Sequence, residues 1–142
     1  MYAIDNTAFG YRMTFVGTVD LDEFQSWLAD SNRQIASASM RFGVLIDVRS
    51  LEPLSPRCQD ILARGQQALR GHGMQRSAVV ASKGYVARQL RMIARASGIS
   101  ENQRYWDAVA RTNWEAEALA WIVYADEPSE CRMFKRSSRS VV

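Results

Sequence analysis

Side chains suited to recognising an anion or a polar partner follow two apolar runs of the chain, 42–48 and 77–81. They are Asp47, Arg49 and Ser50 at the end of the first run, and Ser82 and Lys83 after the second. If the two runs are parallel strands, their carboxyl ends meet at one edge of a sheet, where ligands bind in open α/β folds. Helix N-termini at such an edge offer free amides and a positive partial charge. The pattern therefore predicts a binding site there.

Ser55 and Arg57 add a hydroxyl and a guanidinium to the same predicted edge. Ser55 directly precedes Pro56, and proline is common at the first helical position. A serine before that position caps the helix by accepting a hydrogen bond from a backbone amide. Two interpretations remain open: Ser55 and Ser82 are caps only, or they also contact an anion or a partner.

The other residues with catalytic potential lack neighbouring residues that could act with them in catalysis. His72 is the single histidine and lies between two glycines, in a loop expected at the opposite end of the sheet. Cys58 stands near a predicted helix start, but its register with Ile61 points to the core. Cys58 and Cys131 are expected to be free thiols. Without paired carboxylates, a phosphate loop or clustered metal ligands, we expect no enzyme, no metal and no cofactor.

Arg88, Arg91 and Arg95 recur at helical spacing and predict a basic helix face. The segment 41–111 holds twelve basic and five acidic residues, within a chain of net charge +3. Such a face can meet phosphates or acidic side chains, or it can simply be solvated. No helix-turn-helix, zinc-finger or aromatic-and-basic strand motif accompanies it, so nucleic acid is not an expected partner.

The strands that must position these residues begin with a predicted hairpin. Residues 2–4 are apolar, and 9–15 alternate between large apolar and small or polar side chains. The nearly continuous apolar run 42–48 is typical of a strand covered on both faces. Further strands are expected at 77–81 and 104–106.

Four helices are expected between and after these strands. Their predicted caps are, in chain order, Asp20 with Glu23, Ser55, Ser82, and Thr112 with Glu115. Gly98 is expected to end the third helix. Parallel strands joined by helical crossovers are the usual solution for this order. The sequence therefore predicts an α/β fold with a mixed, mostly parallel sheet.

The length of 142 residues, 47% of them hydrophobic, fits one domain with one core. The core pattern ends near Ala125, so we expect a domain at 1–125 and a flexible tail at 126–142. The longest apolar stretch, 118–125, is too short to span a bilayer. These features lead us to expect a soluble, cytoplasmic protein with no membrane span.

Four local features between residues 2 and 125 together point to a known superfamily. They are the opening hairpin, Phe15-Val16-Gly17 followed by Asp20-Leu21-Asp22-Glu23-Phe24, the run Val44-Leu45-Ile46-Asp47-Val48 before a helix, and a short strand before a Trp-rich helix. With these features the chain resembles the STAS superfamily, which includes the bacterial anti-sigma factor antagonists, and more loosely the STAS/SEC14-like bacterial proteins. The resemblance implies a STAS-like fold.

The resemblance also implies a site of phosphorylation. In the anti-sigma factor antagonists, a partner kinase phosphorylates a serine at the start of the helix that follows the central strand. The matching stretch here reads Leu54-Ser55-Pro56-Arg57-Cys58. Ser55 lies within a residue or two of the expected place. Pro56 and Arg57 replace the small residues of the family's Asp-Ser-Ser-Gly type of pattern.

The expected function is a non-catalytic binding or signalling module that acts at the carboxyl edge of the sheet. Its partner would be a protein or a small ligand, and self-association is possible. The SEC14 side of the resemblance implies an alternative, a carrier for a lipid-like small molecule. A sizeable apolar pocket would favour that alternative.

Overall fold

A computed structural model describes residues 1–38 and 40–128 of the chain. The elements are β1 (Tyr2–Asn6), β2 (Gly10–Gly17), α1 (Leu21–Ile35), β3 (Phe42–Leu51), α2 (Pro56–Gly71), β4 (Met74–Ala81), α3 (Gly84–Ser97), the short 3₁₀ helix η1 (Ser100–Asn102), β5 (Gln103–Asp107) and α4 (Trp114–Tyr124). This order matches the predicted alternation of strands and helices.

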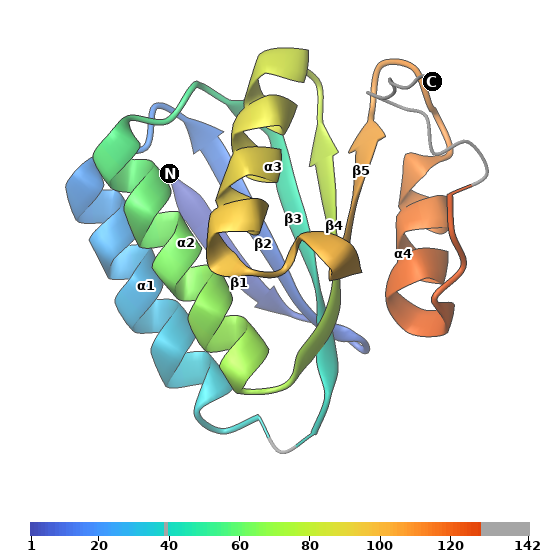
Figure 1. Cartoon of the computed structure of the whole chain (residues 1–142), viewed down its shortest axis with the longest axis horizontal. Coiled ribbons are helices and arrows are strands. Elements are labelled where there is room, and N and C mark those ends of the chain that lie inside the picture. The colour runs from blue at the N-terminus through green and yellow to red at the C-terminus, as the bar shows by residue number, and fades with distance from the viewer. Residues whose placement is uncertain (39, 129–142) are drawn as a thin grey trace.

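The five strands form one mixed sheet in the order β1-β2-β3-β4-β5 (Figure 1). β1 and β2 are the predicted antiparallel hairpin, and the β2–β3, β3–β4 and β4–β5 pairs are parallel. The predicted α/β class with a mixed, mostly parallel sheet is confirmed. Because β2, β3 and β4 run in the same direction, their carboxyl ends meet at one edge, which we call the carboxyl edge.

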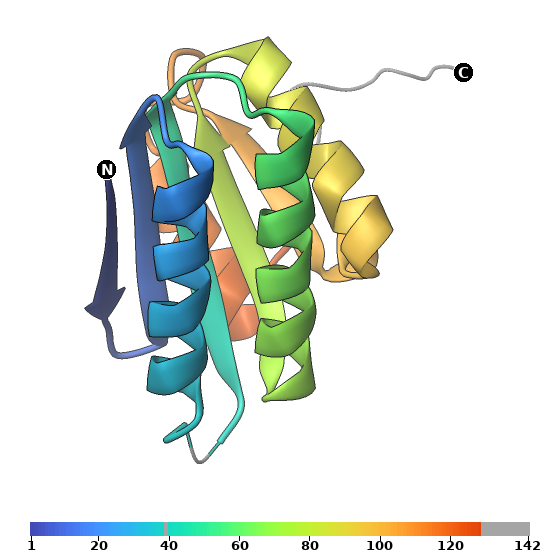
Figure 2. The same cartoon turned by 90° about the vertical axis from the view of Figure 1, so that its left-hand side faces the viewer.

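Helices cover the two faces of the sheet unequally, with α1, α2 and α3 on one face and α4 on the other (Figure 2). β3 lies between the layers, and all of residues 42–48 are buried, as the continuous apolar run predicts. Ile46 belongs to the larger core under the three helices, while Leu45 belongs to the smaller core under α4. Since α4 packs on β3, β4 and β5, the same face of β1 and β2 is less covered. Val16 is 36% exposed there.

Two of the four predicted helix caps are present. The Asp20 side chain accepts a hydrogen bond from the Glu23 amide at 2.9 Å, and the Ser55 hydroxyl accepts one from the Cys58 amide at 3.3 Å. Each bond satisfies an amide that has no partner within the helix. The left-handed Gly98 ends α3, as predicted.

The other two cap predictions were wrong. Lys83, and not Ser82, caps α3, because the Lys83 carbonyl accepts the first helical bond, from the Ala87 amide. Asn113, and not Thr112, precedes α4, because a turn from the Arg111 carbonyl to the Trp114 amide delays the helix. Neither Lys83 nor Asn113 forms a side-chain cap bond.

The described chain continues for three residues beyond the C-cap of α4, Ala125. Glu127 forms two hydrogen bonds of 2.8 Å with the Arg104 guanidinium, and Pro128 is buried. The rest of the predicted tail, with Cys131, lies outside the described residues. Within residues 1–38 and 40–128, no helix is long and apolar enough to cross a membrane.

Candidate functional site

A surface hollow of about 510 Å³ lies at the carboxyl edge. Its lining residues come from the ends of β2 and β3 and from the residue after β4: Thr14, Phe15, Val16, Asp47, Arg49, Ser50 and Ser82. The register of the sheet accounts for this convergence, since Thr14 pairs with Asp47 and Val16 with Ser50. The structure thus places four of the predicted site residues, Asp47, Arg49, Ser50 and Ser82, around one hollow.

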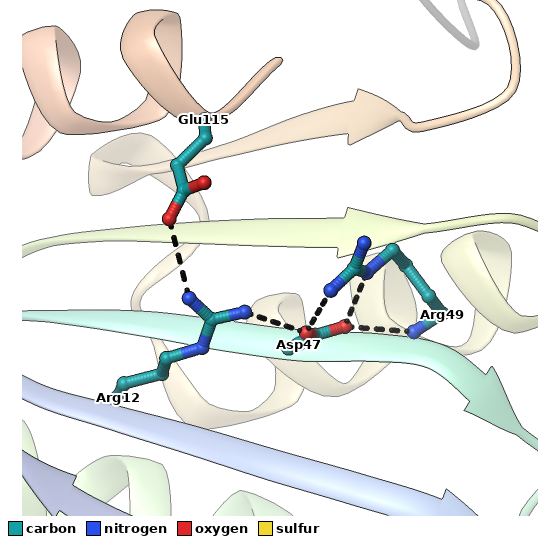
Figure 3. Close-up of polar contacts among 4 residues, drawn as sticks. All are labelled: Arg12, Asp47, Arg49 and Glu115. Atoms are coloured by element: carbon teal, nitrogen blue, oxygen red, sulfur yellow. Dashed lines mark hydrogen bonds and ion pairs between the residues drawn. The ribbon is translucent and has the colours of Figure 1, made fainter. Parts of the chain in front are cut away.

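Asp47 is the most buried polar residue of this hollow, with 5% of its surface exposed. Its carboxylate accepts a hydrogen bond of 2.9 Å from Arg12 and bonds of 3.0 and 2.8 Å from the Arg49 guanidinium (Figure 3). The Arg49 main-chain amide donates a fourth bond, at 3.1 Å. A buried charge is tolerated when it is paired and hydrogen-bonded in this way.

Glu115 and Trp114, at the start of α4, contact the two arginines that bind Asp47. Glu115 lies 3.3 Å from the second terminal nitrogen of Arg12, so Arg12 bridges two carboxylates (Figure 3). The Arg49 guanidinium lies over the Trp114 ring, 4.9 Å from its centre. Two guanidinium groups and two carboxylates therefore form a charge-balanced network between β2, β3 and α4.

The pKa of Asp47 reflects a competition between burial and hydrogen bonding. Burial raises it, whereas hydrogen bonds from the Arg49 side chain and main chain and from Arg12 lower it, and the net pKa lies below its ordinary value. The hydrogen bond that Arg49 donates to Asp47 conversely raises the pKa of Arg49. Asp47 is therefore ionised at neutral pH and fully occupied by donors, which suits a structural anchor better than a general base.

The remaining predicted site residues do not line the hollow. Ser55 and Arg57 are exposed at the start of α2, and Lys83 pairs with Glu52 at 3.0 Å. The segment before α2 is held to α3, because Gln89 bonds both the amide and the carbonyl of Leu54.

Sequence reasoning missed Arg12, Glu115 and Trp114 as members of the site. The alternation of β2 does place Arg12 on the face opposite Met13 and the larger core. That signal shows which face Arg12 occupies, but it does not reveal the partners. Arg12 and Glu115 are separated by 103 positions.

His72 and Cys58 lie where the sequence predicts. His72 is exposed at the end of α2, with Nδ1 3.0 Å from the Ala68 carbonyl. Cys58 is 3% exposed and packs in the larger core. Among the described residues, no group of three or more His, Cys, Asp or Glu side chains could hold a metal ion.

Comparison with known proteins gives matches to solved structures only. No protein-family model and no curated protein matches the chain. The anti-sigma factor antagonist SpoIIAA in its unphosphorylated form superposes with a TM-score of 0.57 at 9% identity, over 82% of this chain and 97% of SpoIIAA. The chain has a SpoIIAA-like fold. The predicted STAS-like fold is thereby confirmed.

A second match extends the SpoIIAA-like comparison to an uncharacterized protein. It belongs to the DUF3478 family, comes from Shewanella loihica PV-4 and is itself described as SpoIIAA-like in fold. Its TM-score is 0.59 at 16% identity, over 86% of this chain and 92% of that chain. At these identities the SpoIIAA-like comparison establishes architecture, and function must be argued from the site.

Proposed function

We propose that this chain is a non-catalytic regulatory module that binds a protein partner at the carboxyl edge. The observation that carries the proposal is the hollow of about 510 Å³ at that edge. The SpoIIAA-like fold supports it, because SpoIIAA is described as an antagonist of an anti-sigma factor, a role exerted on another protein.

The chemistry of the hollow favours binding over catalysis. Its one buried carboxylate, Asp47, already accepts four hydrogen bonds from Arg12 and Arg49. A general base needs a free lone pair directed at a substrate proton, and a nucleophile needs such a base beside it. Of the residues that line the hollow, Thr14, Ser50 and Ser82 carry hydroxyls, but no histidine or free carboxylate lies among them.

The surroundings of the hollow resemble a protein-recognition surface in composition. Val16 offers an exposed apolar side chain, and the exposed Ser50, Ser55 and Arg57 add polar groups and a positive charge. Lys83, 47% exposed, adds a second positive charge that the exposed Glu52 partly offsets at 3.0 Å. Protein interfaces combine an apolar centre with a polar rim of this kind, and rim charges steer the approach of an oppositely charged partner. An acidic partner surface is the best complement.

Charge reversal at the rim tests the proposal. Arg57→Glu with Lys83→Glu is expected to abolish capture of a partner from an extract of the source cells, quantified by mass spectrometry against wild type. The matched control is Arg33→Glu with Arg64→Glu. Like Lys83, Arg33 has one partly exposed ion pair, and Arg64, like Arg57, is exposed on α2. Both double variants should melt within a few degrees of wild type, since each exposed charge alters stability by about 0.5 kcal/mol or less.

A partner retained by the control but lost by the rim variant would then be purified and titrated directly. If both double variants capture the same proteins as wild type, the carboxyl edge is not the binding surface. Ser50→Trp tests the hollow itself, because the large ring would fill the space beside Val16. Ser26→Trp, exposed on α1, is its control and should bind normally.

A carrier function is the second candidate, and one observation favours it. A hollow of about 470 Å³ lies at the opposite edge of the sheet, against α4, with Phe9, Phe42, Leu119 and Ile122 among its lining residues. That volume is within the range of small-molecule sites. Arg41 and Arg76 also line it, so a fatty acid, with an apolar chain and a carboxylate, fits its chemistry.

Titration with a fluorescent fatty acid tests the carrier function. Leu119→Trp should block saturable binding by filling the hollow, while Ser50→Trp should not affect it. Absence of saturable binding to the wild-type chain would eliminate this candidate and leave the partner-binding proposal untouched.

A further inference from the structure

A third hollow, of about 300 Å³, lies between α3, η1 and β5, away from the carboxyl edge. Its lining residues are Arg91, Arg95, Ser100, Gln103, Arg104, Tyr105 and Pro128. None of them belongs to the site described above. Three arginines thus converge on a space of molecular size, and their partners determine what it can bind.

Arg91 is a half-buried cation whose charge is not neutralised by the described residues. Its guanidinium lies over the Tyr105 ring, 4.2 Å from the centre, which holds the group in place. No ion pair of the described residues involves Arg91 or Arg95. Burial, the largest effect, lowers the pKa of Arg91, Tyr105 raises it and the charge of Arg95 lowers it, so a bound anion would stabilise the charged guanidinium.

The other polar residues that line the hollow already form hydrogen bonds within the protein. Arg104 is paired with Glu127 and also donates to the carbonyls of Glu101 and Gln103. The Gln103 amide donates to Ser77 at 2.9 Å, and its oxygen accepts a bond from the Tyr105 hydroxyl. These bonds fix the walls, and they leave the guanidinium groups of Arg91 and Arg95 with the Ser100 hydroxyl as available donors.

We propose that this hollow binds an oxyanion of the phosphate type, held between Arg91 and Arg95 with the Ser100 hydroxyl as a third donor. A guanidinium group matches two phosphate oxygens at once, and two such groups balance a dianion. A carboxylate, with one charge, would leave one of the two arginines unbalanced. The volume of the hollow lies at the lower end of small-molecule sites, so it suits free phosphate or a small phosphate monoester.

Calorimetric titration with inorganic phosphate and with glycerol phosphate, at constant ionic strength, tests the proposal. We expect saturable binding to the full chain. Arg95→Glu should abolish it, and Arg91→Gln should weaken it by about tenfold or more, as expected for the loss of a charge-assisted bond. Arg64→Glu, an exposed reversal on α2, should leave the affinity unchanged and so controls for net charge.

Comparing the affinities for inorganic phosphate and glycerol phosphate distinguishes a free ion from an organic phosphate ester as the bound oxyanion. Tighter binding of glycerol phosphate than of phosphate assigns an organic phosphate ester, and equal binding assigns the free ion. If Arg91→Gln fails to fold, phosphate titration of the exposed Arg95→Glu and Ser100→Ala variants tests the proposal, and both should bind phosphate more weakly than wild type. Equal binding by wild type and Arg95→Glu, or no saturable binding, would overturn the proposal. The variant with Arg57→Glu and Lys83→Glu should still bind phosphate, which separates this site from the carboxyl edge.

Discussion

Asp47 accepts hydrogen bonds from both the main-chain amide and the guanidinium of Arg49, at 3.1, 3.0 and 2.8 Å. The two residues are both on β3, on the face that α4 partly covers. Because the same carboxylate also receives Arg12 from β2, it ties the ends of two strands together. This arrangement explains how a charged residue can occupy a buried position near the end of an apolar strand.

Asp47→Asn is expected to lower the free energy of unfolding by about 1–3 kcal/mol. The amide keeps the shape of the side chain, but it loses the charge that two guanidinium groups contact and directs an NH₂ group toward other donors. Urea unfolding measures the change. Asp60→Asn, exposed on α2, is the control and should change stability by about 0.5 kcal/mol or less. Equal effects of the two substitutions would show that the Asp47 network contributes nothing to stability.

The free energy of unfolding should depend on pH through the ionisation of Asp47. Hydrogen bonds from Arg49 and Arg12 outweigh burial and lower its folded-state pKa, so its contribution is complete above the unfolded pKa of about 3.9. As the pH falls through the folded pKa, that contribution is lost. The stability difference between wild type and Asp47→Asn should therefore be constant from about pH 7 to 5 and narrow below about pH 4. A difference that stays constant down to pH ~2 would contradict this assignment.

Ser55→Ala should destabilise the protein by about 1 kcal/mol, because the hydroxyl that accepts the Cys58 amide is lost from the N-cap of α2. Ser55→Asp should retain the stability of wild type, since aspartate caps as well as serine does. Ser82→Ala is the matched control and should have little effect, because Ser82 is not the cap of α3. Thermal melts of the three variants distinguish capping at Ser55 from a generic effect of removing a serine.

Gly65→Ala should destabilise the contact between α1 and α2. A Cβ atom at Gly65 would lie 2.2 and 2.3 Å from two ring carbons of Trp27, so the ring must move. We expect a net loss of about 1–3 kcal/mol, even though alanine favours helix by about 1 kcal/mol over glycine. Gly71→Ala, in the same helix with no atom within 4 Å of the added Cβ, should instead be neutral or stabilising. Equal stabilisation by both substitutions would place Trp27 elsewhere.

The C-terminal boundary of the domain can be tested by two truncations. A chain that ends after Pro128 should melt like the full chain, because terminal segments without a core pattern contribute little to folding. A chain that ends after Ala125 loses the buried Pro128 and the Glu127 bonds to Arg104, and it should be less stable by about 1 kcal/mol. A large loss of melting temperature on truncation after Pro128 would move the boundary toward the C-terminus.

Local pattern in the sequence was sufficient for the order and type of the strands and α-helices, although it did not predict η1. The alternation in 9–15 predicted β2, and the continuous apolar run at 42–48 predicted a strand covered on both faces. These features are local, because the side-chain period of a strand or helix depends on backbone geometry alone. Element ends were less predictable: β3 extends to Leu51 because its last residues pair with Val16 and Gly17.

The two wrong caps show where local pattern fails. Ser82 and Thr112 are suitable capping residues in suitable places, yet each helix begins one residue later than the serine or threonine would require. The conformation at a helix start is set by the segment that enters it. At α3 the strand β4 ends at Ala81, as predicted, but the chain bends at Ser82, so the first helical bond is accepted by the Lys83 carbonyl.

Sequence alone determined that Asp47, Arg49, Ser50 and Ser82 would meet at one edge, since parallel strands bring their carboxyl ends together. Only the tertiary structure decided that Arg12 and Glu115 complete the network around Asp47 and that Arg91 stacks on Tyr105. Contacts between residues so far apart in the chain depend on how helices dock on the sheet. That docking follows from the packing of whole faces, and the spacing of a few residues along the chain does not encode it.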